Sequence, residues 1–367
     1  MSTTNSASWH LSKNDWSNML HSPHQLTRRS FLAAATVAGL PGTSTRAAGI
    51  SERYAKLGRR GLLGDVVIET KIKDKKIFTE GPAVDARGLV YFTNVPAEKI
   101  LRWDPVRKKL SVFRTRSNKA NGLLFDPDGR LLACEGGAGR VTRTDLGTGK
   151  MTVLADEYEN FPLAAPNDLA LLKSGTLFFT SRPGTPDPTK GNPKAVYQLD
   201  LGTKQPGGRI LHRVLEWKTI HMPNGIVSSP DDKVLYLIEA HPDAGHHRLI
   251  YAYQLDSDTC WTKPRTLINF SPGRSGDGMC IDAEGNLYIA AGLHKTRKTS
   301  ETLDTRPGIH VVSPRGQLLD FVETPVDTIT NCAFGGKDLR SLYVTCGPYL
   351  LSIRTRIPGK AAYRPTK

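Results

Sequence analysis

Short apolar runs separated by polar turns follow one another from residue 65 to residue 357, and no helical periodicity competes with them. The segment 276–292, GDGMCIDAEGNLYIAAG, is typical. Two apolar runs flank a turn that contains Asp282, Gly285 and Asn286, and this arrangement predicts a β-hairpin. The turn does not account for Asp277, a carboxylate placed between two glycines at the start of the first run.

The same hairpin plan occurs six times: a polar residue, a short strand, an Asp/Gly turn and a second strand. The six units begin at Glu80, Asn121, Asn167, Asn224, Asp277 and Asn331. Further strand-like runs bring each unit to about four strands, at a spacing of about 50 residues that is typical of propellers. The sequence therefore predicts an all-β fold, a six-bladed β-propeller of four-stranded antiparallel blades. The run 65–72, DVVIETKI, should complete the last blade, so that an N-terminal strand closes the ring.

The first strand of each propeller blade lines the central channel, so the six residues that open the units should meet around one axis. All six carry a side-chain oxygen, and none is a cysteine or a histidine. Two carboxylates and several amides on one axis are typical of a site for a hard cation such as calcium. The alternative is that each residue only caps the turn before its strand.

Several motifs in order resemble one family. They are TEGPAVDARGLVYFTN from Thr79, APNDLALLKSGTLFFTS from Ala165, MPNGIVSSPDDKVLYLIEA from Met222, DGMCIDAEGNLYIAA from Asp277 and TNCAFGG from Thr330. These motifs are similar to those of the senescence marker protein/gluconolactonase/luciferin-regenerating enzyme family, over roughly residues 65–355. The resemblance implies a six-bladed propeller that holds one divalent cation and hydrolyses lactones of sugar acids or related cyclic esters.

Carried over by motif, the resemblance implies metal ligands at Glu80, Asn224 and Asp277, and Asn167 as a fourth ligand or a substrate contact. Asp277 would also be the catalytic residue that takes the proton from the attacking water, while the metal polarises the ester carbonyl. Asn121 is expected to contact the substrate. The metal varies within the family among calcium, zinc, magnesium and manganese, and the oxygen-only set favours calcium.

Substrate-binding groups are expected on the rim loops 182–194, 241–247 and 292–308, because specificity usually lies on loops held by a rigid scaffold. The candidates are Arg182, His241, His294 and Lys295. The alternative is a solvated lid. The pair His246-His247 lacks a metal-site spacing and is expected to be surface loop. The substrate-binding arginine that some family members carry before the third motif has no counterpart in NFPLAAPND.

Two other functions remain open at this point. The same site could hydrolyse organophosphates or aryl esters, or the protein could be a non-catalytic binding propeller with a structural metal. A serine hydrolase is disfavoured, because the sequence has no GxSxG nucleophile elbow.

The composition suits a soluble chain with many turns: 38% of residues are hydrophobic, and there are 34 glycines and 24 prolines. No apolar run approaches the ~20 residues of a membrane span. The formal net charge of +15 favours a polar or anionic small-molecule substrate, or retention near an anionic cell envelope, since no nucleic-acid-binding motif is present. Among the 5 cysteines, Cys332 and Cys346 could pair, although free thiols are favoured. The oligomeric state is left open.

The N-terminus has the features of a twin-arginine export signal over residues 1–47. Arg28 and Arg29 precede an apolar stretch, and Thr45-Arg46-Ala47 suits a cleavage site. The alternative is an amphipathic helix that carries two arginines. The sequence therefore predicts export to the periplasm or the cell exterior, a linker at 48–64, the propeller at 65–357 and a tail at 358–367.

Overall fold

The computed structural model describes residues 53–54, 57, 61–182, 190–201, 210–216, 218–257, 260–261 and 264–360. The predicted export signal lies outside these residues. The named elements of the described chain are strands, together with one short 3-10 helix, η2 (Val95–Ala97). None of its helices has the length and apolar character of a membrane span.

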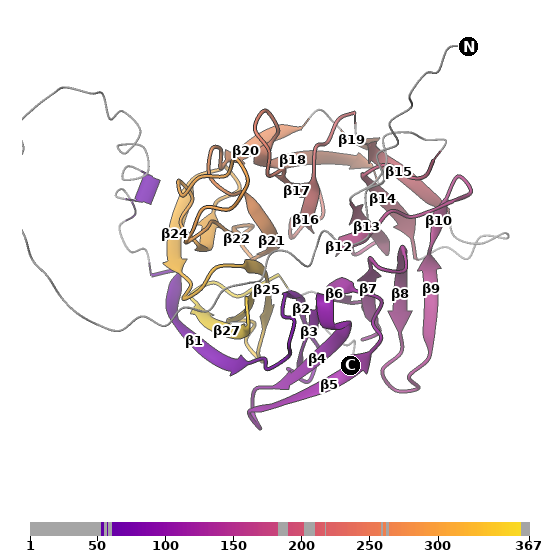
Figure 1. Cartoon of the computed structure of the whole chain (residues 1–367), viewed down its shortest axis with the longest axis horizontal. Coiled ribbons are helices and arrows are strands. Elements are labelled where there is room, and N and C mark those ends of the chain that lie inside the picture. The colour runs from indigo at the N-terminus through magenta and orange to yellow at the C-terminus, as the bar shows by residue number, and fades with distance from the viewer. Residues whose placement is uncertain are drawn as a thin grey trace, which may run out of the picture. The chain divides into compact units, whose positions relative to one another are not determined.

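Six antiparallel sheets, the blades, follow one another around a ring (Figure 1). Blade one contains β2 (Thr79–Val84), β3 (Val90–Asn94), β4 (Lys99–Asp104) and β5 (Lys109–Thr115). Blade two contains β6 (Ala120–Phe125), β7 (Leu131–Glu135), β8 (Arg140–Thr144) and β9 (Met151–Ala155). Blade three contains β12 (Pro166–Leu171), β13 (Thr176–Ser181), β14 (Ala195–Asp200) and β15 (Leu211–Glu216).

Blade four contains β16 (Pro223–Ser228), β17 (Val234–Ala240), β18 (Arg248–Ser257) and β20 (Arg265–Asn269), and β19 (Cys260–Trp261) also pairs with β18. Blade five contains β21 (Gly276–Ile281), β22 (Leu287–Ala291), β23 (Gly308–Val312) and β24 (Leu318–Glu323). Blade six contains β25 (Ile329–Gly335), β26 (Ser341–Cys346), β27 (Tyr349–Thr355) and β1 (Leu63–Lys71). A separate hairpin joins β10 (Glu157–Tyr158) to β11 (Phe161–Pro162).

The ring closes through blade six, because β1 pairs antiparallel with β27, with Val67 opposite Ser352. The first strands of the blades contact one another in sequence around the centre, from β2 through β6, β12, β16 and β21 to β25 and back to β2 (Figure 1). This confirms the predicted six-bladed propeller and its closure by an N-terminal strand.

Aspartate and glycine shape the turns between first and second strands, as the sequence pattern predicts. In blade one, Oδ1 of Asp85 accepts hydrogen bonds from the amides of Arg87 and Leu89, both at 2.9 Å. Gly88 then takes a positive φ of 85°, a conformation that suits glycine. Similar aspartate-centred turns occur at Asp126 and Asp282.

The core lies between the blades. Six apolar clusters in the described chain each join two neighbouring blades. The second strands, for example β3 and β7, are buried along their whole length, which explains their continuous apolar runs. The outer strand β1 instead leaves Val67 and Ile68 about half exposed. Packing on both faces therefore holds the inner strands rigidly around the channel.

Cys134, Cys280, Cys332 and Cys346 are free thiols. Sγ of Cys332 lies 3.4 Å from Sγ of Cys280 on the neighbouring blade. Sγ of Cys346 donates to the carbonyl oxygen of Val326 at 3.3 Å. The structure therefore has no disulfide between Cys332 and Cys346.

Candidate functional site

A break in strand pairing occurs at the start of every first strand. In blade four the register between β16 and β17 shifts between Pro223 and Ile226, and in blade five that between β21 and β22 shifts between Gly276 and Met279. Similar shifts occur in the other four blades. A bulge of this kind releases residues from the ladder and redirects their side chains. Asn224 and Asp277 lie within two of these bulges.

Glycine follows several of these polar residues because neighbouring first strands approach closely. A Cβ on Gly81 would lie 2.2 Å from the carbonyl oxygen of Asn121, and a Cβ on Gly225 would lie 2.8 Å from that of Asp277. A Cβ on Gly122 would likewise lie 2.7 Å from the carbonyl oxygen of Asn167, and a Cβ on Gly278 would lie 2.1 Å from the side-chain Cγ of Asn331. In these four blades the polar-glycine pair therefore brings the first strand into contact with the polar residue of the next blade.

Asn224 and Asp277 lie in contact at the centre of the ring, although they come from blades four and five. Nδ2 of Asn224 donates to Oδ1 of Asp277 at 2.5 Å. Arg274 donates from Nη2 to Oδ2 of Asp277, also at 2.5 Å, and from Nη1 to the carbonyl oxygen of Ile329 at 3.0 Å. Arg182 donates to Oδ1 of Asn224 at 3.1 Å. Two arginines thus hold the pair from either side.

Glu80 and Asp168 add two further carboxylates to this centre. Glu80 is 2% exposed, and one of its oxygens accepts a hydrogen bond from the amide of Gly81 at 3.2 Å. Burial raises the pKa of Glu80 well above its usual value, and the charges of Asp277 and Asp168 raise it further. Burial also raises the pKa of Asp168 to about 7. Acidic groups are therefore concentrated in a buried space that disfavours their ionised forms.

Oxygen donors from blades one, four and five thus converge, and their chemistry fits a hard cation. Glu80 and Asp277 would supply carboxylates, and Asn224 would supply the amide oxygen that accepts from Arg182 here. A bound cation would offset the charge that raises the pKa of Glu80. The geometry is therefore consistent with the predicted metal ligands Glu80, Asn224 and Asp277.

The remaining residues of the predicted axial set lie close by. Asn167 is 7% exposed at the start of β12. Nδ2 of Asn331, in blade six, donates to Oδ2 of Asp168, in blade three, at 3.3 Å, so this contact spans the channel. Asn121 is half-buried, and its backbone oxygen accepts from Thr93 at 3.1 Å.

The predicted substrate-binding residues do not all gather at this centre. Arg182 contacts Asn224 directly. His241 stacks on His246 with a ring separation of 3.8 Å, in blade four. His294 faces the last strand of blade five, with Nε2 2.8 Å from the carbonyl oxygen of Thr324. Lys295 is exposed.

Arg274, which is 7% exposed and binds Asp277, was not among the residues predicted from the sequence. It lies three residues before Asp277, in a segment with no strand pattern. An arginine three residues before an aspartate is not a recognised motif. The contact is therefore visible only in the structure, where Arg274 is buried against the carboxylate of Asp277.

The fold and the centre together define a six-bladed propeller with a buried, oxygen-rich polar site on its axis. Residues 78–347 match the family model described as SMP-30/Gluconolactonase/LRE-like region, and the chain belongs to this family.

Named relatives support the same family assignment. The chain is 27% identical to a gluconolactonase of Zymomonas mobilis over 305 residues, which cover 77% of this chain and 80% of the relative. It is 26% identical to regucalcin of Xenopus laevis, over 77% of this chain and 87% of the relative. Among solved structures, a gluconolactonase of Xanthomonas campestris aligns with a TM-score of 0.64 and 27% identity, over 83% of this chain and 92% of that one.

Proposed function

We propose that the protein is a metal-dependent hydrolase that opens a lactone, of a sugar acid or a related cyclic ester. Membership of the family and similarity to gluconolactonases support this proposal. The observation that carries it is the contact between Asn224 and Asp277, together with the electrostatic interaction of Asp277 with the buried Glu80, because these bring together polar residues of three blades.

Glu80, Asn224 and Asp277 would hold the cation, with Asn167 as a fourth ligand or a substrate contact. The bound cation would polarise the ester carbonyl and stabilise the charge that develops on its oxygen. The oxygen-only donor set favours calcium, and zinc, magnesium and manganese are the alternatives. A solved structure described as a calcium-binding protein, regucalcin of Agrobacterium tumefaciens, shares the fold at 20% identity.

Asp277 would accept the proton of the attacking water. Arg274 and Asn224 each bind one oxygen of its carboxylate, so they fix its direction. Arg182 would contact a hydroxyl or carboxylate of the substrate, since its guanidinium lies beside the same site and extends from a rim loop. Asn121 is proposed as a further substrate contact.

The protein is further proposed to act outside the cytoplasm, after export through the twin-arginine signal at residues 1–47. Sequencing of the exported protein should find an N-terminus near residue 48. Exported protein that begins at Met1 or Ser2 would contradict the assignment.

The experiment is a proton-release assay on aldonolactones, aryl esters and a phosphotriester, before and after treatment with a chelator. Asp277→Asn should lower kcat/KM for the lactones about 100-fold or more, since a general base contributes this much. The control is Asp338→Asn, the same change at an exposed ion pair with Arg354, which should leave kcat/KM unchanged.

Loss of activity on chelation and recovery with added cation would support the proposal. Turnover of only the phosphotriester or the aryl esters would instead indicate an organophosphate or aryl-ester hydrolase. A folded protein that binds metal but turns over none of these substrates would be a binding propeller, and the proposal would be wrong.

A further inference from the structure

Blade four contains a buried carboxylate that is incompletely paired. Glu239, on β17, is 0% exposed. Its Oε2 accepts hydrogen bonds from the amides of His221 and Met222 at 2.7 and 2.9 Å. Its Oε1 is buried and has no hydrogen-bond partner among the described residues. A buried oxygen of this kind is costly unless a ligand or an ion satisfies it.

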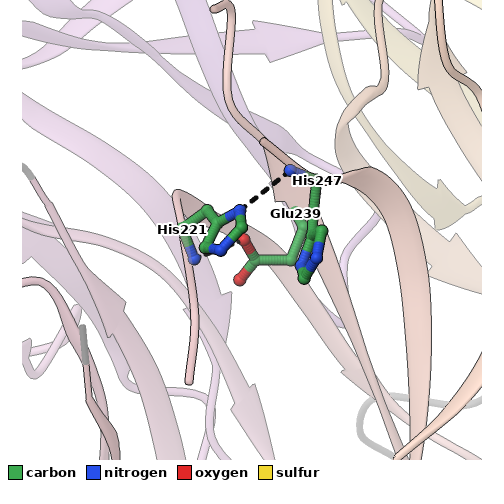
Figure 2. Close-up of side chains that lie close together, drawn as sticks. All are labelled: His221, Glu239 and His247. Carbon is green, nitrogen blue, oxygen red and sulfur yellow. Dashed lines mark hydrogen bonds between the residues drawn. The ribbon is translucent and has the colours of Figure 1, made fainter. Parts of the chain in front are cut away.

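Two imidazoles flank this carboxylate (Figure 2). Ligand atoms of His221, Glu239 and His247 all lie within 4.8 Å of one another. The rings of His221 and His247 stack at 3.9 Å. Nδ1 of His247 pairs with the hydroxyl of Tyr251 at 3.0 Å, which fixes the ring and leaves Nε2 for another ligand. Both histidines are half-buried, so the cluster is accessible from solvent.

Blade two offers an internal comparison. Glu135 pairs with Ala120 just as Glu239 pairs with Pro223, so the two glutamates occupy matching positions in the fold. Glu135 binds Arg114 at 2.6 Å and Arg140 at 2.9 Å. Two arginines thus balance its charge within the protein.

Glu239 has no such partner among the described residues. The nearby Lys194 uses its ammonium group on the carbonyl oxygen of His221, at 2.5 Å. Glu135 is balanced by two guanidinium groups, Arg114 from blade one and Arg140 from blade two. Glu239 is instead flanked by two imidazoles, and a positive ion would complete the arrangement.

We propose that His221, Glu239 and His247 form a binding site for a transition-metal ion of the zinc class. Two imidazole nitrogens with one carboxylate oxygen form a ligand set that suits zinc, whereas calcium takes oxygen ligands alone. Three protein ligands leave a position toward solvent for water or a substrate group. This rim site lies next to the axial centre, because Glu239 pairs with Pro223, which precedes Asn224.

Metal binding at this site should change one defined hydrogen bond. The amide of His247 donates to Nδ1 of His221 at 2.9 Å (Figure 2). A metal on Nδ1 would take the lone pair that accepts this hydrogen bond. A metal on Nε2 of the neutral ring would place the ring proton on Nδ1, and the hydrogen bond would again be lost. The amide signal of His247 should therefore shift when metal binds.

The test uses the full chain without an added polyhistidine tag, stripped with a chelator and titrated with zinc and with cobalt(II). Calorimetry should find one equivalent of zinc that is lost in His247→Asn and in Glu239→Gln. The control is His212→Asn, the same change at an exposed histidine of β15, which should keep that equivalent. The cobalt complex should show the visible absorption of a nitrogen-ligated ion.

Glu80→Gln should weaken binding at the axial centre while this equivalent remains, so failure of the lactonase proposal and of the rim site are distinguishable. If His247→Asn and Glu239→Gln, both folded by circular dichroism, keep the full zinc stoichiometry, the rim site does not exist. The same conclusion follows if zinc binds and the amide signal of His247 does not move.

Discussion

Blades two and four place a glutamate at the same point of the fold and surround it differently. Glu135 and Glu239 are both 0% exposed at the end of a second strand. Glu135 is held by two arginines, an asparagine and a threonine. Glu239 is held by two backbone amides and flanked by histidines. The repeat therefore determines where a buried carboxylate lies, and the residues around it determine whether the protein or an added ion balances its charge.

The largest expected difference is in stability. Glu135→Gln should lower the free energy of unfolding by about 3 kcal/mol, the lower end of the range for a broken buried ion pair. The lower end applies because Arg114 and Arg140 keep 19% and 25% of their side-chain surface exposed and can reach water. Urea unfolding of the metal-free protein measures this, and Glu239→Gln should show no comparable loss. Equal losses in both variants would remove the contrast between the blades.

The next effect is stabilisation by metal. Zinc at about 100 times its dissociation constant should raise the free energy of unfolding of the wild-type protein by about 2.7 kcal/mol. The effect should vanish in Glu239→Gln and persist in Glu135→Gln, provided that the latter folds. Thermal melting at a series of zinc concentrations provides the measurement. A zinc effect that survives Glu239→Gln would place the ion elsewhere.

The smallest effect is on the pH dependence of the free energy of unfolding. Glu135 and Glu239 should contribute slopes of opposite sign, each of at most about 1.4 kcal/mol per pH unit. Burial alone would raise the pKa of Glu135, but Asn118, Arg114, Arg140 and Thr142 together hold it below 4.5. Its contribution to stability is therefore present above the unfolded pKa and is lost as pH falls through the folded value.

Glu239 should behave in the opposite way in the metal-free protein. Burial raises its pKa to about 7 from 4.5, against the amides of Met222 and His221 and the charge of Lys194. The folded state then binds the proton more tightly, so stability is greatest below pH 4.5 and declines as pH rises to about 7. Subtracting the profile of Glu239→Gln from that of the wild type separates this slope from titration of the surrounding histidines. A difference profile that rises with pH would contradict it.

Much of the fold could be predicted from sequence, because propeller blades are local. Each hairpin is encoded by contiguous residues, such as the Asp85 turn, and the spacing of the repeats determines the number of blades. Asn224 and Asp277 each open a repeat unit, and this shared position also indicated that both would face the axis. The family resemblance then supplied chemical roles for them, and the model match over residues 78–347 confirmed the family.

The sequence by itself thus determined the strand order, the closure by β1 and the oxygen-bearing residues that open each unit. Only the tertiary structure decided which charges meet. Arg274 is buried against Asp277 from the segment just before β21, and no motif marks that contact. The rim site was hidden for the same reason: His221 and His247 are separated by two strands of blade four, so the spacing of His246-His247 along the chain indicated only a loop. Local patterns specify strands and turns, whereas the balance of buried charge depends on side chains that become neighbours when the sheet forms and the ring closes.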